Sequence, residues 1–308
     1  MSSPCLVVFA ALRSGTTMLR LMLDAHPQMS CTGEHDFLFD FLSRTPDGWA
    51  YDHEALRNDW LFRQTGFVVR DDLDGLDLMA DLIGQIGAQG GGRPVLMLHR
   101  NLHQALELLP EVPLVHMLRD PRDVARSAIG MLWANHVYFG ADTWLKTETE
   151  WEKHSTAVEG RTLTIRYEDL VEQPQDTLAA LCRHVGLPFD DRMLTYDQHS
   201  TYDRPDPALA RQWRRKLTPE EVRLVEGKVG PLLASRGYEP AGAPPLVPSP
   251  FQLLRLRLGN RLGLWRRMAR IYGWSPLLRR RLGRAFGLDG VRRGAEQEIE
   301  AILLKRLK

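Results

Sequence analysis

The chain has 308 residues, of which 44% are hydrophobic and 26% charged, and its formal net charge is +1. This composition is that of a folded protein with a substantial core, so it excludes a disordered or fibrous chain. Three widely spaced cysteines, Cys5, Cys31 and Cys182, form no CxxC pair, which argues against a disulfide framework or structural zinc site and favours a reducing compartment. With no basic leader segment and no apolar run of roughly 18 residues, we expect a cytoplasmic protein without a membrane span.

The charge is divided unevenly along the chain. Residues 251–308 contain 15 Lys and Arg against 4 Asp and Glu, a net charge of +11, which leaves −10 for residues 1–250. A stretch rich in Pro, Ala and Gly precedes this basic segment and is typical of a linker. We therefore expect a domain over residues 1–240, a linker over 241–250 and a basic helical tail over 251–308.

The predicted elements of the first 240 residues alternate between strands and helices. Short apolar runs predict buried strands at 5–10, 95–99, 112–118 and 162–167. Amphipathic patterns and capping signals predict helices at 17–25, 121–135, around Trp144 and Trp151, at 175–185 and at 218–235. Strands separated by helices predict an α/β fold, a P-loop-like three-layer sandwich with a central parallel sheet flanked by helices.

The loop "RSGTT", Arg13 to Thr17, lies between the first strand and its helix. Such a loop points backbone N–H groups and a helix N-terminus at one spot, which favours an anion. ATP- and GTP-binding loops carry a lysine for the terminal phosphates, whereas here Arg13 precedes Gly15 and no lysine follows. Arg13 can hold a phosphate or sulfonate without a metal, and the alternative is a polar turn that only caps the helix.

A second candidate anion site follows the strand at 112–118, in "RDPRDVARS". Arg119 ends that strand and Ser127 lies eight residues later, within the next helix. Open α/β sheets bind ligands at the C-terminal ends of their strands. The alternative is that Arg119 pairs with Asp120 or Asp123 to stabilise the turn. Two anion sites on one sheet edge favour a nucleoside ligand with phosphates at both ends.

With both motifs in view, the sequence resembles the sulfotransferases that use 3′-phosphoadenosine 5′-phosphosulfate (PAPS). "RSGTT" is similar to the family's 5′-phosphosulfate loop and "RDPRDVARS" to its 3′-phosphate segment, over roughly residues 5–240. The tyrosylprotein sulfotransferases and their bacterial relatives are especially similar, because "RSGTTMLRLMLDAHP" matches their loop and helix.

The resemblance implies a site residue by residue. The 5′-phosphosulfate would be held by Arg13, Ser14, Gly15, Thr16 and Thr17, and the 3′-phosphate by Arg119 and Ser127. Tyr167 would lie near the adenosine. Glu34 would be the catalytic base, and the transferring sulfate would lie near Arg100 and Ser200. The resemblance implies PAPS as co-substrate and no metal. A general base must reach the acceptor hydroxyl, and His35, His99 and His103 are alternatives to Glu34.

The sequence also departs from the family pattern. Arg100 stands where the family has a lysine, Leu102 replaces a proline, and Gln212 replaces a lysine before Trp213. Arg211 or Arg214 would then substitute for the missing C-terminal cation.

The basic tail has an amphipathic pattern. Leu254, Leu258, Leu262, Trp265, Met268 and Tyr272 recur on one helical face with arginines around them. This pattern is typical of a helix on an anionic membrane, which would make the protein peripheral to the inner face of the membrane. The alternative is packing on the acidic body or on a second copy in a homodimer. Nucleic-acid binding is not expected, because a leucine stripe is no stacking platform.

We therefore expect an enzyme that moves a sulfuryl group from PAPS to an acceptor hydroxyl on a lipid, glycan, metabolite or peptide. A P-loop kinase is one alternative, which the absent lysine and the lack of an acidic magnesium segment oppose. A catalytically degenerate, membrane-associated binding protein is the other, and it would need neither Glu34 nor two anion sites.

Overall fold

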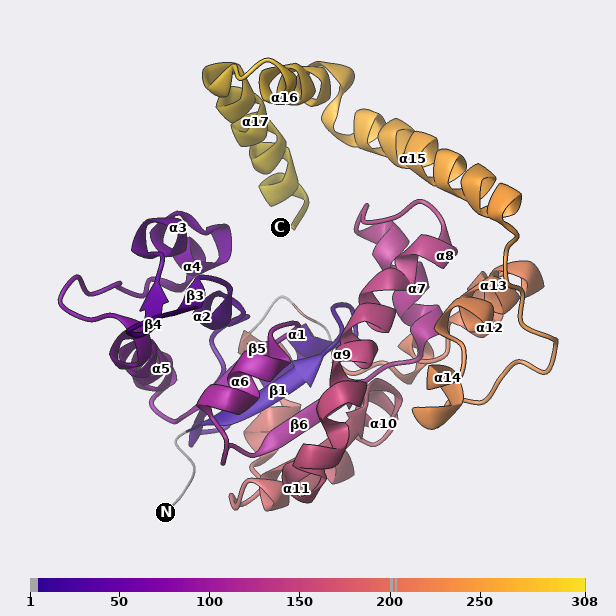
Figure 1. Cartoon of the computed structure of the whole chain (residues 1–308). Helices are drawn as coiled ribbons and strands as arrows, with labels where there is room; N and C mark the ends of the chain where they lie inside the picture. Colours follow the sequence, from indigo (N-terminus) through magenta and orange to yellow (C-terminus); the bar gives the residue numbers. More distant parts are fainter. Residues whose placement is uncertain (1–4, 200–201, 203, 308) are drawn as a thin grey trace.

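The computed structural model describes residues 5–199, 202 and 204–307. Its main sheet has five parallel strands in the order β2-β5-β1-β6-β7 (Figure 1). The strands are β1 Leu6–Ala10, β2 Met29–Ser30, β5 Arg93–Leu98, β6 Leu114–Leu118 and β7 Thr162–Arg166. The four strands predicted from apolar runs are confirmed, because β1, β5 and β6 are buried on both faces as a covered parallel sheet requires.

Helices cover both faces of this sheet, so the predicted three-layer α/β fold is confirmed. Alternate residues of β1 enter different cores: Val7 and Phe9 pack on one side, Leu6 and Val8 on the other. The first core includes residues of α5 Gly75–Gly90, α6 Leu102–Leu108 and α9 Asp142–Val158. The second includes residues of α1 Thr16–Asp24, α10 Tyr167–Glu172 and α11 Pro174–His184.

The remaining elements of the body surround these layers. Before α5 the chain forms α2 Phe37–Asp40, the antiparallel pair β3 Leu42–Thr45 and β4 Gly48–Tyr51, α3 His53–Asn58 and α4 Trp60–Thr65. A third core joins α7 Pro121–Gly130, α8 Val137–Gly140, α13 Pro219–Val229 and α14 Leu232–Ser235. Short helices η1 Glu159–Arg161, η2 Asp191–Leu194, η3 Tyr196–His199, η4 Pro207–Leu209 and α12 Trp213–Lys216 complete the body.

One predicted helix is too long and another is interrupted. The helix predicted at 121–135 ends at Gly130, and Leu132 beyond it takes a left-handed φ of 62° that a helix cannot continue. The helix predicted at 218–235 is divided into α13 and α14 by Gly230, with φ 57°, and Pro231. The capping signal predicted for the helix at 218 is confirmed as a capping box, since Thr218 and Glu221 bond each other's backbone N–H groups.

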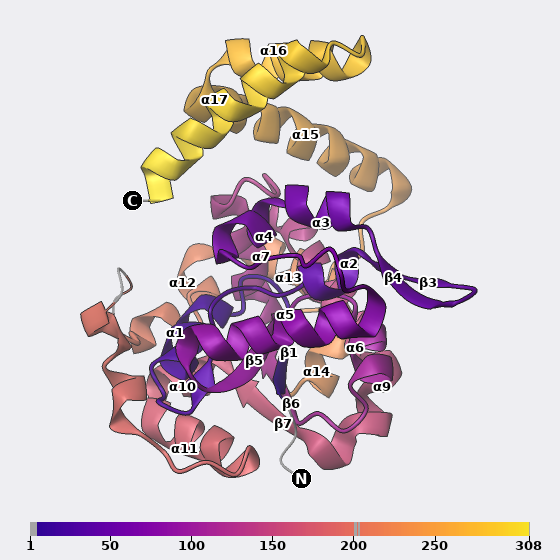
Figure 2. The ribbon, with the colours of Figure 1, turned by 90° about the vertical axis from the view of Figure 1, so that its left-hand side faces the viewer.

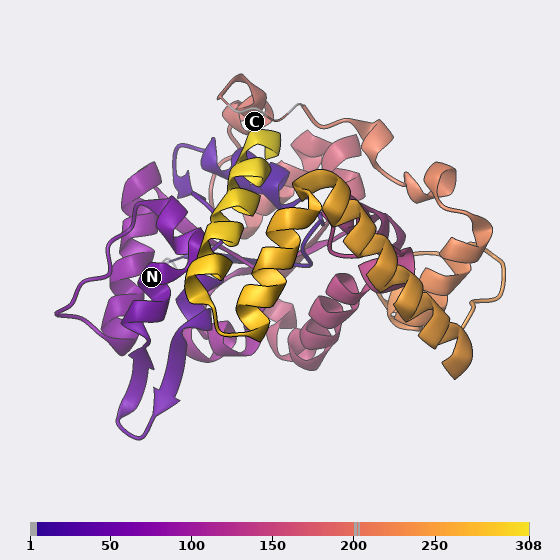
Figure 3. The same cartoon turned by 90° about the horizontal axis from the view of Figure 1, so that it is seen from above.

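The basic tail is helical, as predicted, and consists of α15 Pro250–Tyr272, α16 Trp274–Ala285 and α17 Asp289–Leu307. These helices form an arch above the body in Figures 1 and 2, and they lie across it when seen from above in Figure 3. Residues 238–249 before them form neither helix nor strand, and the division into domain, linker and tail stays a prediction. No helix among the described residues is long and apolar enough to cross a membrane.

The predicted leucine stripe of α15 has two environments. Leu254, Leu258 and Leu262 are 53%, 61% and 53% exposed. Further along the same face, Trp265 and Met268 pack on a small core shared with α16 and α17. The helix is attached to the body through Asn260, whose Oδ1 accepts hydrogen bonds from the backbone N–H groups of Asn135 and His136 at 2.7 and 3.0 Å.

Candidate active site

The loop after β1 is shaped by two left-handed residues. Arg13 has a φ of 73° and Gly15 a φ of 91°, and α1 begins directly after Gly15. A Cβ atom on Gly15 would lie 2.3 Å from Cδ2 of Tyr167, so the backbone approaches that ring more closely than any side chain allows. Ser14 is buried, and its hydroxyl has no hydrogen-bond partner among the described residues. A buried hydroxyl without a partner at a helix N-terminus fits an anionic ligand.

The two predicted anion sites meet in space. Arg13 Nε donates to Ser127 Oγ at 3.1 Å, and Arg119 Nη1 donates to the carbonyl oxygen of Arg13 at 3.0 Å. The guanidinium of Arg119 also lies over the Tyr167 ring, 3.9 Å from its centroid. The structure shows no ion pair between Arg119 and Asp120 or Asp123, so the turn-stabilising alternative finds no support among the described contacts.

The charges around this junction are unbalanced. Burial lowers the pKa of Arg13, and the neighbouring Arg119 lowers it further. Nε of Arg119 is buried without a hydrogen-bond partner among the described residues. A bound anion between the two guanidinium groups would offset their repulsion and use these donors.

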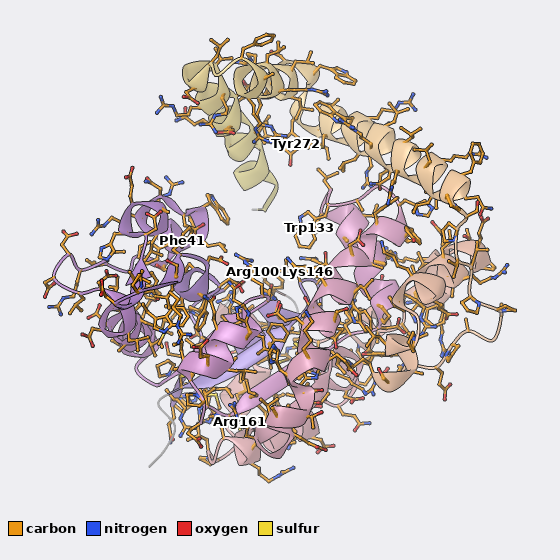
Figure 4. The ribbon with its side chains drawn as sticks, viewed as in Figure 1. Phe41, Arg100, Trp133, Lys146, Arg161 and Tyr272 are labelled. Carbon is orange, nitrogen blue, oxygen red and sulfur yellow. The ribbon has the colours of Figure 1, made fainter. Side chains whose placement is uncertain are left out.

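Both arginines line one cavity of about 720 Å³. Its walls include the loop, α7, the exposed aromatic side chains of Trp60 and Trp133, and the carboxylate of Glu34. Trp133 lies below the arch of the tail helices in Figure 4. The cavity therefore combines an anion-binding floor, one carboxylate and an apolar rim.

Glu34 is positioned by the two residues that follow it, which are hydrogen-bonded to the end of β5. Nδ1 of His35 accepts from the backbone N–H of Met97 at 3.1 Å, and Asp36 Oδ1 accepts from that of His99 at 2.9 Å. These bonds place Glu34 Oε1 3.5 Å from Nε2 of His99, with the Glu34 side chain 33% exposed and that of His99 1% exposed. The nearby His99 holds the pKa of Glu34 below its usual range, against the effect of burial, so the carboxylate is ionised at neutral pH.

Two of the alternative bases lie elsewhere. His35 is fully buried, and burial lowers the pKa of its imidazole to about 3. His103 faces Glu150 at 3.8 Å and lines a second cavity, between α6 and α9. Neither side chain lines the cavity of the two arginines.

Arg100 also lies on the second cavity. Its Nε donates to Asp40 Oδ1 at 2.8 Å, a second bond joins it to Asp40, and Nη1 lies 3.4 Å from Asp36 Oδ2. The carboxylates neutralise this guanidinium, which lies beside Lys146 in Figure 4. The structure therefore does not bring Arg100 to the cavity that Glu34 lines, and Ser200 lies outside the described residues.

Sequence reasoning missed Arg126, which lies on α7 and lines the same cavity as Arg13 and Arg119. Its Nη1 donates to Oε1 of Gln212 at 3.0 Å. Gln212 is the residue that replaces the family's C-terminal lysine, whereas Arg211 pairs with Glu172 and Arg214 lies beside Trp213. Arg126 could have been predicted from the missing lysine at position 212 together with an arginine of no assigned role next to Ser127.

An anion-binding type of loop, a second arginine at the end of β6 and a carboxylate lining the same cavity define a group-transfer enzyme of the P-loop-like α/β class. Among the described residues, no three His, Cys, Asp or Glu side chains are arranged to hold a metal ion. The sequence comparisons identify the family.

A model of the sulfotransferase family matches residues 4–191, and the chain belongs to that family. Protein-tyrosine sulfotransferase A of Caenorhabditis elegans is 23% identical over 282 residues, covering 82% of this chain and 72% of that protein. Protein-tyrosine sulfotransferase 1 of Danio rerio is 24% identical, covering 79% and 74%. The sulfotransferase domain of the Synechococcus PCC 7002 olefin synthase has the same fold, with a TM-score of 0.56, 21% identity and coverage of 72% and 93%. The protein is a PAPS-dependent sulfotransferase, and the comparisons favour neither a kinase nor a degenerate binding protein.

Proposed function

We propose that the 720 Å³ cavity binds PAPS across the junction of Arg13, Arg119 and Ser127. The loop from Arg13 through Ser14, Gly15 and Thr16 to Thr17 holds the 5′-phosphosulfate, and Arg119 with Ser127 holds the 3′-phosphate. The observation that carries this assignment is the contact between the two motifs, through Arg13 Nε and Ser127 Oγ at 3.1 Å. Tyr167 supports this assignment, because its ring lies close to Gly15 and under the guanidinium of Arg119.

Arg126 supplies the cation that the missing lysine would supply. It lies one residue before Ser127 and is oriented by Gln212, with its guanidinium on the cavity wall. A guanidinium can hold a phosphate through two donors. Gln212 carries no charge, so it orients the Arg126 side chain by a hydrogen bond and leaves its positive charge for the phosphate.

Glu34 acts as the general base. The acceptor oxygen forms a bond to sulfur as the bond between sulfur and the 5′-phosphate oxygen breaks, and the electron pair leaves with that phosphate oxygen. The proton of the acceptor hydroxyl passes to the Glu34 carboxylate, which lines the same cavity as Arg13. Arg13 stabilises the negative charge on the leaving oxygen, and the positive side chains give this stabilisation without a metal. Ser200 lies near the sulfate in this proposal. Arg100 would have to break its ion pair with Asp40 to reach the sulfate.

The acceptor is a hydroxyl compound, and we propose that it is presented at an anionic membrane, on the cytoplasmic face. Exposed Leu254, Leu258 and Leu262 together with the arginines around them support the contact with the membrane. The rim residues Trp60 and Trp133 support an acceptor with an apolar part. The three cysteines are free and buried, which suits a reducing compartment.

Glu34→Gln tests the assignment of the base. The variant should lose about 100-fold or more in kcat with PAPS and an acceptor. Its affinity for adenosine 3′,5′-bisphosphate (PAP), measured by calorimetry, should stay close to that of the wild type. Asp40→Asn is the matched variant, because it removes a carboxylate that pairs with Arg100 of the second cavity and does not line the cavity of Glu34. Unchanged turnover in Glu34→Gln would remove Glu34 from the chemistry.

A further inference from the structure

His99 and Glu34 form a contact that the family resemblance does not describe. Nδ1 of His99 donates to the carbonyl oxygen of Ala10 at 2.8 Å, because a carbonyl oxygen only accepts. This bond fixes the ring and aims Nε2 toward Glu34 Oε1, 3.5 Å away. Nε2 is buried and has no hydrogen-bond partner among the described residues, so its contact with Glu34 is an ion-pair contact at this distance.

We propose that His99 is a positioning residue, an imidazolium that holds the Glu34 carboxylate ionised and aimed into the cavity. This inference rests on the proposed role of Glu34 as base. His99 is not itself the base, because Glu34 lines the cavity and His99, at 1% side-chain exposure, does not. After Glu34 takes up the acceptor proton, His99 keeps its own proton and orients the neutral carboxyl group.

The surrounding charges support a protonated ring. Burial opposes the imidazolium, but Glu34 and Asp36 together raise the pKa of His99. A neutral ring with its proton on Nδ1 would instead turn the Nε2 lone pair toward a carboxylate. The other charged groups that interact electrostatically with Glu34 are Arg13, Arg20 and Arg100, of which Arg100 is engaged by Asp36 and Asp40.

Two substitutions of His99 separate its hydrogen bond to Ala10 from its positive charge beside Glu34. Asparagine at position 99 can keep the donor to Ala10 but has no group at Nε2, and glutamine can keep a neutral donor near Glu34. His99→Asn should lower kcat by about 100-fold, because a misaligned base loses its reacting geometry. His99→Gln should retain more of kcat than His99→Asn. In both variants the acidic limb of the kcat/KM profile should move to higher pH, since Glu34 loses the partner that lowers its pKa.

Two controls separate this inference from a purely structural role. PAP affinity and the thermal unfolding temperature should stay close to wild type in His99→Gln. His53→Gln removes a comparable imidazole contact, 3.4 Å from Asp74, and should leave the pH profile unchanged. A wild-type acidic limb in both His99 variants would overturn the positioning role.

A measurement without turnover tests the same pair if the His99 variants fail to fold. The imidazole protons of His99 can be titrated by NMR in the wild type and in Glu34→Gln. Removing the carboxylate charge should lower the pKa of His99, and an unchanged titration would contradict the ion pair. If the wild-type protein did not bind PAP, that result would instead contradict the proposed function.

Discussion

Gly15 illustrates how a single residue determines the shape of the site. Its φ of 91° is left-handed, and Tyr167 fills the space that a side chain would need. The backbone of the loop can therefore pack against the Tyr167 ring, over which the guanidinium of Arg119 also lies. The close packing of loop, ring and arginine brings the two predicted anion sites together.

Gly15→Ala should destabilise the fold by about 1–3 kcal/mol and weaken PAP binding, because the left-handed backbone and the contact with Tyr167 both oppose a Cβ atom. Thermal unfolding and PAP calorimetry measure the two effects. Gly160→Ala is the matched control, since a Cβ atom there meets nothing within 4 Å and the backbone is not left-handed. A Gly15→Ala protein that binds PAP as tightly as the wild type would contradict this account of the loop.

The sequence allowed Arg13, Arg119 and Ser127 to be predicted as anion ligands because each lies within a local motif. The contact of Glu34 with His99 could not be predicted in this way. It depends on bonds from His35 and Asp36 to the end of β5, which join segments far apart in the chain. The diversion of Arg100 to Asp40 depends on the same three-dimensional arrangement.

Helix α7 carries two arginines with different tasks. Arg122 is buried, paired with Asp120 and Glu226, and stacked 3.7 Å from the centroid of the Trp213 ring. Arg126 lies one turn further along and lines the cavity. One helix therefore packs in the third core and, in our proposal, presents a ligand for the co-substrate.

Arg126→Gln should weaken PAP binding by about 1.5–3 kcal/mol, the usual contribution of a hydrogen bond to a charged group, with little change in stability. Arg122→Gln should instead lower the free energy of unfolding by about 3–5 kcal/mol, because it leaves buried carboxylates unpaired. Denaturant unfolding and PAP calorimetry on both variants check this division. Equal effects on binding and stability in the two variants would contradict it.

At the scale of elements, apolar runs predicted the buried strands well because a covered parallel strand needs apolar residues on both faces. Helices were predicted poorly where a left-handed residue ends or interrupts them, as at Leu132 and Gly230. The two-residue strand β2 and the short helix α10 carry no periodic signal of their own, and tertiary packing determines both.

The whole molecule combines an acidic body with a basic arch. Residues 1–250 carry a formal charge of −10 and residues 251–308 a charge of +11. Exposed leucines lie on α15 and α16, including Leu258 and Leu282 at 61% and 50% exposure. Apolar side chains among arginines are the chemistry that binds an anionic lipid surface.

The full chain should bind vesicles containing anionic phosphatidylglycerol and bind neutral phosphatidylcholine vesicles weakly, with binding that falls as salt rises. Leu258→Glu combined with Leu282→Glu should lower vesicle affinity by about 100-fold or more, since each change removes a large apolar contact. Leu76→Glu on α5, 47% exposed in the body, is the control. Co-sedimentation measures binding, and size-exclusion chromatography shows whether a second copy covers the stripe instead. Wild-type vesicle binding by the double variant would contradict the membrane contact.

The central claim is that one cavity holds both charged ends of a PAPS-type nucleotide at Arg13, Arg119 and Ser127. Calorimetry with PAP in the presence of a metal chelator tests it most directly. We expect one binding site per chain, much weaker binding of ATP, and loss of PAP binding in Arg119→Gln. No binding of PAP, or equal binding of ATP and PAP, would contradict the account.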